Sequence, residues 1–262
     1  ERIDIDDGDF LDLDWCRTGS RRLVVISHGL EGHSRRHYII GMAKALVDSG
    51  WDALAWNFRS CGGSMNRHLR FYHSGATEDL HRVIDYATQT GDYDEVALVG
   101  FSMGGNLSLV YLGDRAAPAN PKVKKAVVYS VPCDLSASEE QLSQPQNTIY
   151  MKRFLKDLKA KMLAKERLFP EHLDLNGYEQ IKNFRQFDDR YTAPIHGFKD
   201  AHHYWEHCSS RRSWIVRRTG PSAGACPLLG REQKAGDERR SGWTVIFQSA
   251  IVRAIATRCS ES

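Results

Sequence analysis

Ser102 lies midway between Gly100 and Gly104, in the sequence Gly-Phe-Ser-Met-Gly. An apolar run, 96–99, precedes this pentapeptide, and a helix-like run, 105–112, follows it. Between a strand and a helix, such a pattern forms a sharp turn that raises the serine hydroxyl above the end of a parallel sheet. A hydroxyl in that position can attack a carbonyl carbon once a base takes its proton. We therefore predict that Ser102 is a catalytic nucleophile whose turn depends on the two glycines.

A second short segment could stabilise the negative charge that such an attack creates. His28-Gly29-Leu30-Glu31-Gly32 follows directly on an apolar run, 23–27, which is where a loop with an oxyanion-binding amide is expected. We predict that the backbone N–H groups of Leu30 and Met103 are the two donors, and that Gly29 lets the backbone approach the oxyanion. Losing one such donor typically costs about 3 kcal/mol of transition-state stabilisation. His28 is predicted to support this loop, because its side chain points along the loop itself.

The partners that a nucleophilic serine needs are not found where they are expected. A histidine takes the proton, and a carboxylate orients that histidine. When the serine lies in a G-x-S-x-G turn between a strand and a helix, the acid and then the histidine follow it along the chain. The last histidine is His207, and the only aspartate after Ser209 is Asp237, within a polar run. His73 is a conceivable substitute base, although its Tyr-His-Ser-Gly loop favours a packing role. We therefore assign no triad Asp or His, and we predict a disabled site with a rate loss of order a million-fold.

These residues need a scaffold in which strands and helices alternate. The sequence predicts buried strands at 23–27, 53–58, 96–99 and 125–130, helices at 38–49, 77–90 and 105–112, and a hairpin of 3–5 with 10–15 around Asp7-Gly8. Strands and helices that alternate in this way form a mostly parallel central sheet with helices on both faces. Ligands then bind at the carboxyl ends of the strands. The predicted fold class is therefore α/β.

Three regions of the chain differ in composition. Residues 1–135 carry the alternating pattern and are predicted to form the core. Residues 136–208 are poor in strands and include a long helical run, 150–168, so we predict a helical cap whose apolar side chains pack on the body or line an acyl site. Residues 209–262 hold ten Lys+Arg against four Asp+Glu, whereas the whole chain has a net charge of +3. This segment has no periodicity or binding motif, so we interpret it as an aberrant basic tail and predict no nucleic-acid partner.

Composition also indicates the environment of the protein. The 262 residues include six cysteines that are scattered without CxxC pairs, which favours free thiols in a reducing compartment. No signal-peptide pattern is seen, and no apolar run approaches the roughly 18 residues of a membrane-spanning helix. We predict a cytoplasmic protein with no transmembrane segment, no metal and no other cofactor.

Two functions of other kinds stay open. His203-Tyr204-Trp205-Glu206-His207 matches the pattern H-x-x-E-H of certain zinc hydrolases. On a helix His203 and His207 share one face and could hold zinc with Glu206 as the base, but a further carboxylate ligand is not apparent. A non-catalytic binding protein that retains only the ligand site is the other alternative. Labelling with a fluorophosphonate would separate an active serine from a silent one.

Several segments together resemble the YheT-like α/β-hydrolases, which are related to the eukaryotic α/β-hydrolase-domain esterases. The resemblance runs over about 2–211. The matching segments are 28–32, Asn57-Phe58-Arg59 with Cys61, Gly63, Asn66 and Arg67, Tyr72-His73-Ser74-Gly75, 100–106, Phe187-Asp188-Asp189, Thr192-Ala193-Pro194, His196-Gly197-Phe198 and Asp200-Ala201. The resemblance implies an α/β-hydrolase fold with a helical cap. It also implies a carboxylesterase with a Ser-Asp-His triad that acts on a small-molecule ester or lipid with short to medium acyl chains.

The resemblance ends close to Arg211. Such proteins continue after Ser209-Ser210 with a phenylalanine-leucine segment, a strand, an Asp-containing turn and a Gly-Gly-His turn, none of which is present. We therefore expect the C-terminal strands of the fold to be missing or disordered. A one-base slip of the reading frame near Arg212 accounts for this, because the codons TTC CTG GAT CGT, read one base later, encode Ser-Trp-Ile-Val, as found at 213–216. The alternative is genuine divergence of the C-terminus.

Overall fold

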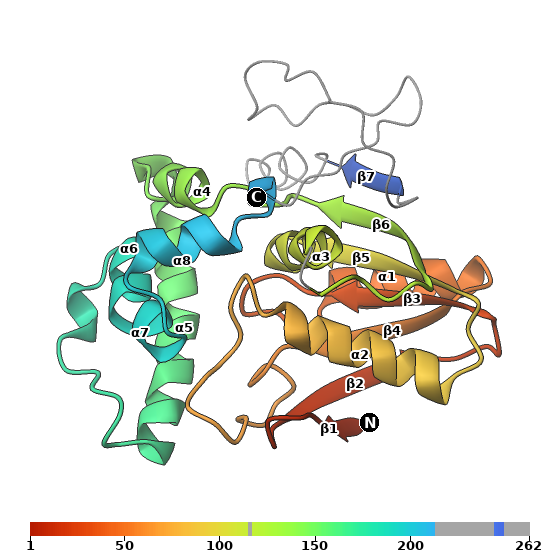
Figure 1. Ribbon diagram of the computed structural model, residues 1–262. Helices are drawn as coiled ribbons and strands as arrows, with labels where there is room; N and C mark the ends of the chain where they lie inside the picture. The colour runs from red at the N-terminus through yellow and green to blue at the C-terminus, as the bar shows by residue number, and fades with distance from the viewer. Residues whose placement is uncertain (115–116, 213–243, 249–262) are drawn as a thin grey trace.

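The described residues form one sheet with helices on both of its faces (Figure 1). The computed structural model describes residues 1–114 and 117–212, together with a backbone strand at 244–248. The strand order is β1-β2-β4-β3-β5-β6-β7. The strands are β1 (Arg2–Asp4), β2 (Phe10–Cys16), β3 (Arg22–Ser27), β4 (Asp52–Asn57), β5 (Glu95–Phe101), β6 (Val123–Tyr129) and β7 (Thr244–Gln248), and the helices between them are α1 (His37–Asp48), α2 (Thr77–Thr90) and α3 (Met103–Gly113).

Strand directions confirm the predicted hairpin and the mostly parallel sheet. β1 and β2 are antiparallel, with Ile3 opposite Leu11, and β2 is also antiparallel to β4. From β4 through β3, β5 and β6 the strands run parallel. Ser27, the last residue of β3, pairs with Gly100 of β5. The loop that follows β3 therefore begins beside the turn that follows β5.

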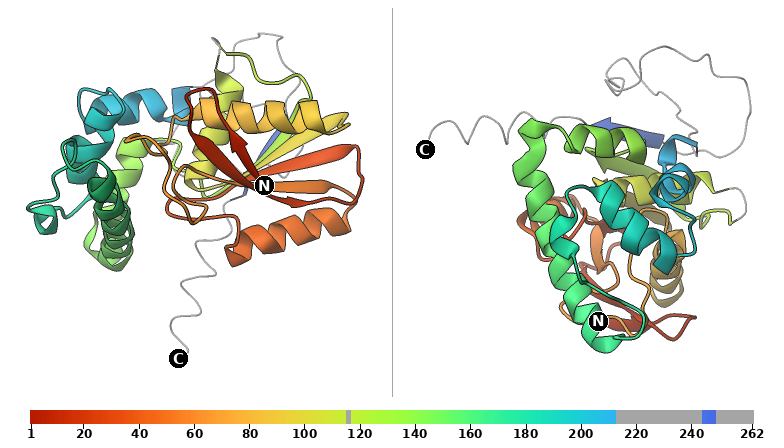
Figure 2. Two further views of the ribbon diagram at one scale, coloured as in Figure 1. Left: turned by 90° about the horizontal axis from the view of Figure 1, so that it is seen from below. Right: turned by 90° about the vertical axis from the view of Figure 1, so that its left-hand side faces the viewer.

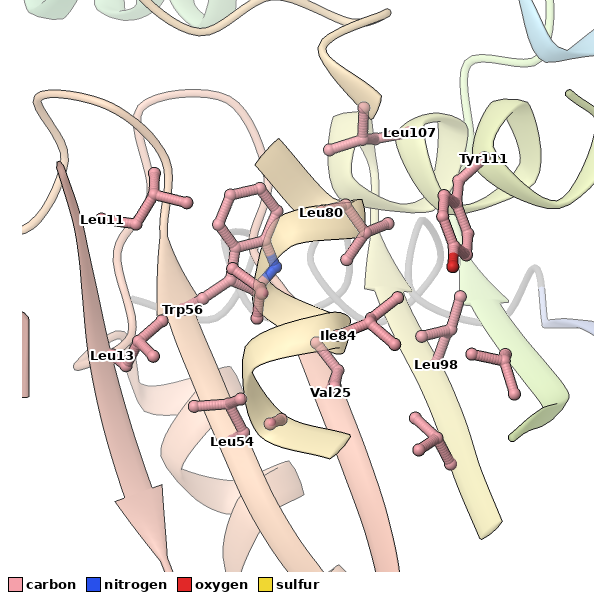
Figure 3. Close-up of a cluster of buried hydrophobic side chains, with 14 of the residues drawn as sticks. Leu11, Leu13, Val25, Leu54, Trp56, Leu80, Ile84, Leu98, Leu107 and Tyr111 are labelled. Atoms are coloured by element: carbon pink, nitrogen blue, oxygen red, sulfur yellow. The ribbon is translucent and has the colours of Figure 1, made fainter. Parts of the chain in front are cut away.

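Alternate residues of the parallel strands are buried on opposite faces of the sheet. Val25 and Leu98 pack with residues of α2 such as Leu80 on one face (Figure 3). Val24 packs with Ile39 of α1 on the other face. Figure 2, left, shows α1 on the side of the sheet opposite α2. Because helices cover both faces of the sheet, these strands appear in the sequence as continuous runs of apolar residues. That pattern is why they could be predicted from the sequence.

A group of helices lies beyond the sheet, on the side toward which β6 points (Figure 1). It comprises α4 (Leu135–Leu142), η1 (Pro145–Asn147), α5 (Thr148–Leu168), η2 (Tyr178–Gln180), α6 (Phe184–Phe187), a π-helical turn η3 (Asp188–Thr192), α7 (Ala193–Ile195), α8 (Ala201–Cys208) and η4 (Ser210–Arg212). Leu155, Leu158 and Met162 of α5 are buried with Phe187 and Tyr191 in a core of this group. The apolar face of α5 therefore serves mainly to pack these helices together. None of the described helices is both long enough and apolar enough to cross a membrane.

One strand lies in the segment that we expected to contribute none. β7 pairs in parallel with β6, with Thr244 opposite Lys125 and Gln248 opposite Tyr129. The expectation that the C-terminal strands are missing is therefore corrected at this position. The backbone run 244–248 includes three apolar residues, and the open edge of β6 offers it hydrogen-bond partners. The rest of the predicted basic tail after Arg212, including Asp237, lies outside the described residues.

Candidate active site

Ser102 occupies the turn between β5 and α3 in a backbone conformation that is rare for a residue with a side chain, with φ 52° and ψ −118°. Its N–H donates to the carbonyl oxygen of Tyr129 at 2.8 Å, and its carbonyl oxygen accepts from the N–H groups of Gly105 and Asn106. A positive φ in such a residue costs on the order of 1–3 kcal/mol and persists only where the surroundings fix it. These hydrogen bonds to β6 and α3 supply that fixation.

Gly100 and Gly104 are required by close packing around this turn. A methyl group at Gly100 would lie 2.5 Å from Cα of Gly105. A methyl group at Gly104 would meet the backbone of the β3 end, 2.5 Å from the carbonyl oxygen of Ser27. Backbone atoms cannot move aside as flexible side chains do, so any larger residue at either position would displace the turn. These close contacts are the reason we expect only glycine to fit at the two positions.

The loop after β3 comes directly against the turn. A methyl group built on Gly29 would lie 3.4 Å from Cβ of Ser102. Within 1–114 and 117–212, the backbone N–H groups of Leu30 and Met103 donate no hydrogen bond. Tyr38 of α1 supports this loop and was not predicted: its hydroxyl accepts a hydrogen bond of 3.1 Å from the Gly29 N–H. A tyrosine in the first turn of the helix that follows this loop is the signal that was available.

His28 is a buried part of the same loop. Its Nδ1 lies 2.8 Å from the carbonyl oxygen of Gly29, and its Nε2 accepts from the N–H of Phe58 at 3.2 Å. Burial lowers the pKa of His28 to about 3, so the ring is neutral at ordinary pH. Both ring nitrogens of His28 are therefore engaged within the fold, and neither is free to act as a base.

Among the described residues, His73 forms no hydrogen bond with Ser102. Its Nδ1 accepts from the N–H of Gly75 at 3.2 Å, and its ring lies 4.6 Å from that of His196. Burial, followed by the nearby His196, lowers the pKa of His73 well below its usual value. These contacts agree with the packing role that its loop suggested.

Asn106, in the first turn of α3, joins the turn to two distant segments and was missed by the sequence analysis. Its Nδ2 donates to the carbonyl oxygens of Ser74, at 3.1 Å, and Cys208, at 2.8 Å. Its Oδ1 accepts from the N–H of Ser210 at 2.9 Å. The residue is fully buried, so all three bonds are shielded from water. An amide in the mostly apolar stretch 105–112 was the available signal, since buried polar groups need partners.

One cluster of possible metal ligands is found among the described residues. Asp7, Asp9 and His68 each offer an atom within 4.8 Å of the others. However, the guanidinium of Arg59 lies 2.7 Å from Asp7 and 2.9 Å from Asp9, and it also pairs with Asp79. Because these carboxylates are already paired with Arg59, we assign no metal there.

The zinc alternative gains no third ligand within the part of the chain that the structure describes. His203 and His207 lie on α8 with their ring centroids 4.1 Å apart. His207 Nδ1 is bonded to the carbonyl oxygen of His203 at 2.8 Å, and Glu206 forms an ion pair with Arg212. No carboxylate joins the two histidines in a ligand cluster among these residues.

Several known proteins are similar in sequence to this chain. Residues 22–173 match a family model described as the alpha/beta hydrolase fold. The chain is 34% identical over 217 residues to the putative esterase YheT of Escherichia coli, covering 80% of this chain and 63% of that protein. It is 29% identical over 222 residues to phospholipase ABHD3 of Bos taurus, covering 81% and 54%, and 26% identical over 242 residues to a monoacylglycerol lipase of Saccharomyces cerevisiae, covering 88% and 54%.

The chain thus spans between 54% and 63% of the length of these relatives. The similarity to YheT confirms the resemblance predicted from the motifs. The family model covers more than half of the chain, including the loop after β3 and the Ser102 turn. The chain therefore belongs to the α/β hydrolase family.

Proposed function

We propose that this chain is a serine carboxylic-ester hydrolase with Ser102 as the nucleophile. The observation that carries this proposal is the strained Ser102 turn, held between β5 and α3 with the Gly29 loop packed against it. The esterase and lipase names of the relatives support the same class of reaction. In the first step Ser102 Oγ forms a bond to the ester carbonyl carbon while its proton is removed. The alcohol then leaves with a proton, and water releases the acid.

The two unpaired backbone donors give the oxyanion a place to bind. We propose that the N–H groups of Leu30 and Met103 donate to the oxygen that becomes negatively charged during attack. Donors fixed in place by the fold need no reorganisation when charge develops, which is the source of their catalytic effect. Gly29 allows the Leu30 amide to approach, and Gly104 holds the Met103 amide against β3.

The general base is the part of the mechanism that the described residues do not supply. Within 1–114 and 117–212, His28 uses both ring nitrogens and His73 packs against His196. We propose that Ser102 in this chain acts without a histidine partner and is therefore impaired. When a catalytic triad loses its base, the oxyanion hole and substrate binding still accelerate the reaction about 10³–10⁴-fold over the uncatalysed reaction in water.

The substrate and setting follow from the same comparisons. We propose an ester or lipid with a short to medium acyl chain, since relatives include a phospholipase and a monoacylglycerol lipase. We propose that the helices α4 to α8 form a cap over the site. Among the described residues, Cys16, Cys61 and Cys208 form no disulfide, which supports a reducing, cytoplasmic location.

Chemical rescue tests the proposal with the chain as it stands. Hydrolysis of p-nitrophenyl butyrate is measured with increasing imidazole, which can act as the missing base. The rate above the solution reaction should rise with imidazole in the wild-type chain and in Ser130→Ala, whose serine also has a positive φ at a strand end. It should vanish in Ser102→Ala. Equal rates in wild type and Ser102→Ala would favour the non-catalytic binding protein instead.

A further inference from the structure

We propose that Lys161, a buried lysine of α5, is a positioning residue that ties the cap to the loop carrying the Leu30 amide. This inference rests on the proposed function, because it assigns Lys161 a role in orienting one of the two oxyanion donors. The structural half of the inference, a link between α5 and residues 29–32, can be tested without any enzymatic activity.

Lys161 reaches the body of the protein through three contacts. Its Nζ lies 3.0 Å from Oε1 of Glu31 and 3.0 Å from Sγ of Cys61, and 4.4 Å from the ring centroid of Tyr72. The side chains of Lys161 and Glu31 are only 6% and 11% exposed. Because this ion pair is shielded from solvent, water and dissolved salt weaken its attraction less than they weaken that of an ion pair on the surface.

Glu31 is held at every polar group that it has. Its N–H donates to the Tyr72 hydroxyl at 3.2 Å, and its carboxylate accepts from that same hydroxyl. Its carbonyl oxygen accepts from Nη2 of Arg36 at 3.1 Å. Its backbone has φ 52°, which a glutamate adopts only where contacts impose it. Glu31 directly follows Leu30, so fixing Glu31 fixes the peptide plane next to the proposed donor.

The charge of Lys161 is essential to this arrangement. Burial alone would lower the pKa of Lys161, but the adjacent Cys61 and Glu31 raise it overall, so the amine stays protonated. Removing one member of a buried ion pair leaves the other charge without compensation. Without the ammonium, the Glu31 carboxylate would be drawn toward water, and the loop would move with it.

Lys165 provides a matched comparison one helical turn away. It is also a buried lysine of α5, but its Nζ donates to Oδ1 of Asn66 at 2.6 Å and to the carbonyl oxygen of Arg70 at 3.3 Å. It therefore joins α5 to the loop of residues 66–70, and it forms no hydrogen bond or ion pair with residues 29–32. The two lysines separate a specific effect on the Gly29 loop from a general loosening of the cap.

The experiment compares Lys161→Met with Lys165→Met in the full chain. Hydrogen–deuterium exchange of a peptide covering 28–33 reports the protection of the Gly29, Glu31 and Gly32 amides, each of which donates a hydrogen bond. We expect Lys161→Met to speed this exchange about tenfold and Lys165→Met to leave it unchanged. Imidazole-rescued hydrolysis should show about a tenfold lower kcat in Lys161→Met with KM within about twofold, and Lys161→Arg should restore part of it.

Each outcome decides one part of the inference. Equal exchange of 28–33 in wild type and Lys161→Met, or equal acceleration by Lys165→Met, would overturn the link to the loop. Faster exchange with unchanged kcat in an active wild type would overturn the positioning role. An inactive wild type refutes the proposed function, while the exchange comparison still tests the link. If Lys161→Met does not fold, Glu31→Gln, which keeps an acceptor for Tyr72 and loses the charge, must show the same faster exchange.

Discussion

Asn106 shows how one buried side chain can hold three separate segments together. Its side-chain amide forms hydrogen bonds with the backbone of the Tyr-His-Ser-Gly loop, of the end of α8 and of the start of η4. Ser74 and Cys208 lie 32 and 102 residues away from it in the chain. Since Asn106 also lies in the first turn after Ser102, the segments that it holds are fixed relative to the proposed nucleophile.

Asn106→Ala should therefore lower the free energy of unfolding by about 2–4 kcal/mol, because two carbonyl oxygens and one N–H lose their partner in a buried place. Equilibrium unfolding in urea measures this change. Asn147→Ala is the matched control, because half-buried Asn147 makes one solvent-exposed side-chain hydrogen bond, to the carbonyl oxygen of Gln141, and its loss should change stability by less than about 0.5 kcal/mol. Equal losses in the two variants would contradict the bridging role of Asn106.

Asp188 gives a pH dependence that can be measured. Burial raises the pKa of Asp188 from 3.8 to about 7, although Thr192 and Trp205 donate hydrogen bonds to it. The folded chain then binds this proton more tightly than the unfolded chain, so the contribution of Asp188 to stability falls as pH rises from 3.8 to about 7. It is constant above that range.

Asp188→Asn should remove this dependence. Thermal unfolding at pH 5 and pH 8 should show a smaller loss of stability in Asp188→Asn than in wild type, with a difference on the order of 2 kcal/mol. Asp189→Asn alters the neighbouring carboxyl, which is 43% exposed, and should keep the wild-type dependence. Parallel pH curves for wild type and Asp188→Asn would show that Asp188 titrates as an ordinary carboxyl.

At the scale of elements, the position of α3 depends on its glycines. Gly104→Ala would press a methyl group against the β3 end, so α3 must move and the free energy of unfolding should fall by about 2 kcal/mol or more. Gly41→Ala, inside α1 with no atom near its added methyl group, should instead stabilise by about 0.5–1 kcal/mol. Urea unfolding of both variants checks the contrast, and a neutral Gly104→Ala would mean that α3 is not packed so closely.

The helices and strands that could be predicted are those whose pattern of apolar residues can be seen within one continuous segment of the sequence. α2 falls at 77–90 as predicted, because its apolar residues repeat at helical spacing and face the sheet. The Ser102 turn is likewise encoded locally by its two glycines. The Asn106 and Lys161 contacts could not be predicted, because their partners lie up to about 130 residues away and are chosen by the packing of the helices against the sheet.

At the scale of the whole molecule, we interpret the segment after Arg211 as a departure from the family pattern in a chain that keeps the Ser102 turn. A slipped reading frame near Arg212 predicts that the neighbouring frame of the coding DNA encodes an Asp-containing turn and a Gly-Gly-His turn. Sequencing that DNA checks this directly. A chain made from the restored frame should hydrolyse esters about 10⁶-fold faster than the present one. If neither other frame encodes the two turns, the C-terminus has diverged and the slip is rejected.

The central claim, that Ser102 is a nucleophile beside two oxyanion donors, is tested most directly by prolonged labelling of the full chain with a fluorophosphonate. Tandem mass spectrometry then locates the adduct. We predict slow, stoichiometric modification of Ser102, accelerated by imidazole and lost in Ser102→Ala. Modification spread over several serines, or none at Ser102 while an intact esterase labels fully under the same conditions, would contradict the claim.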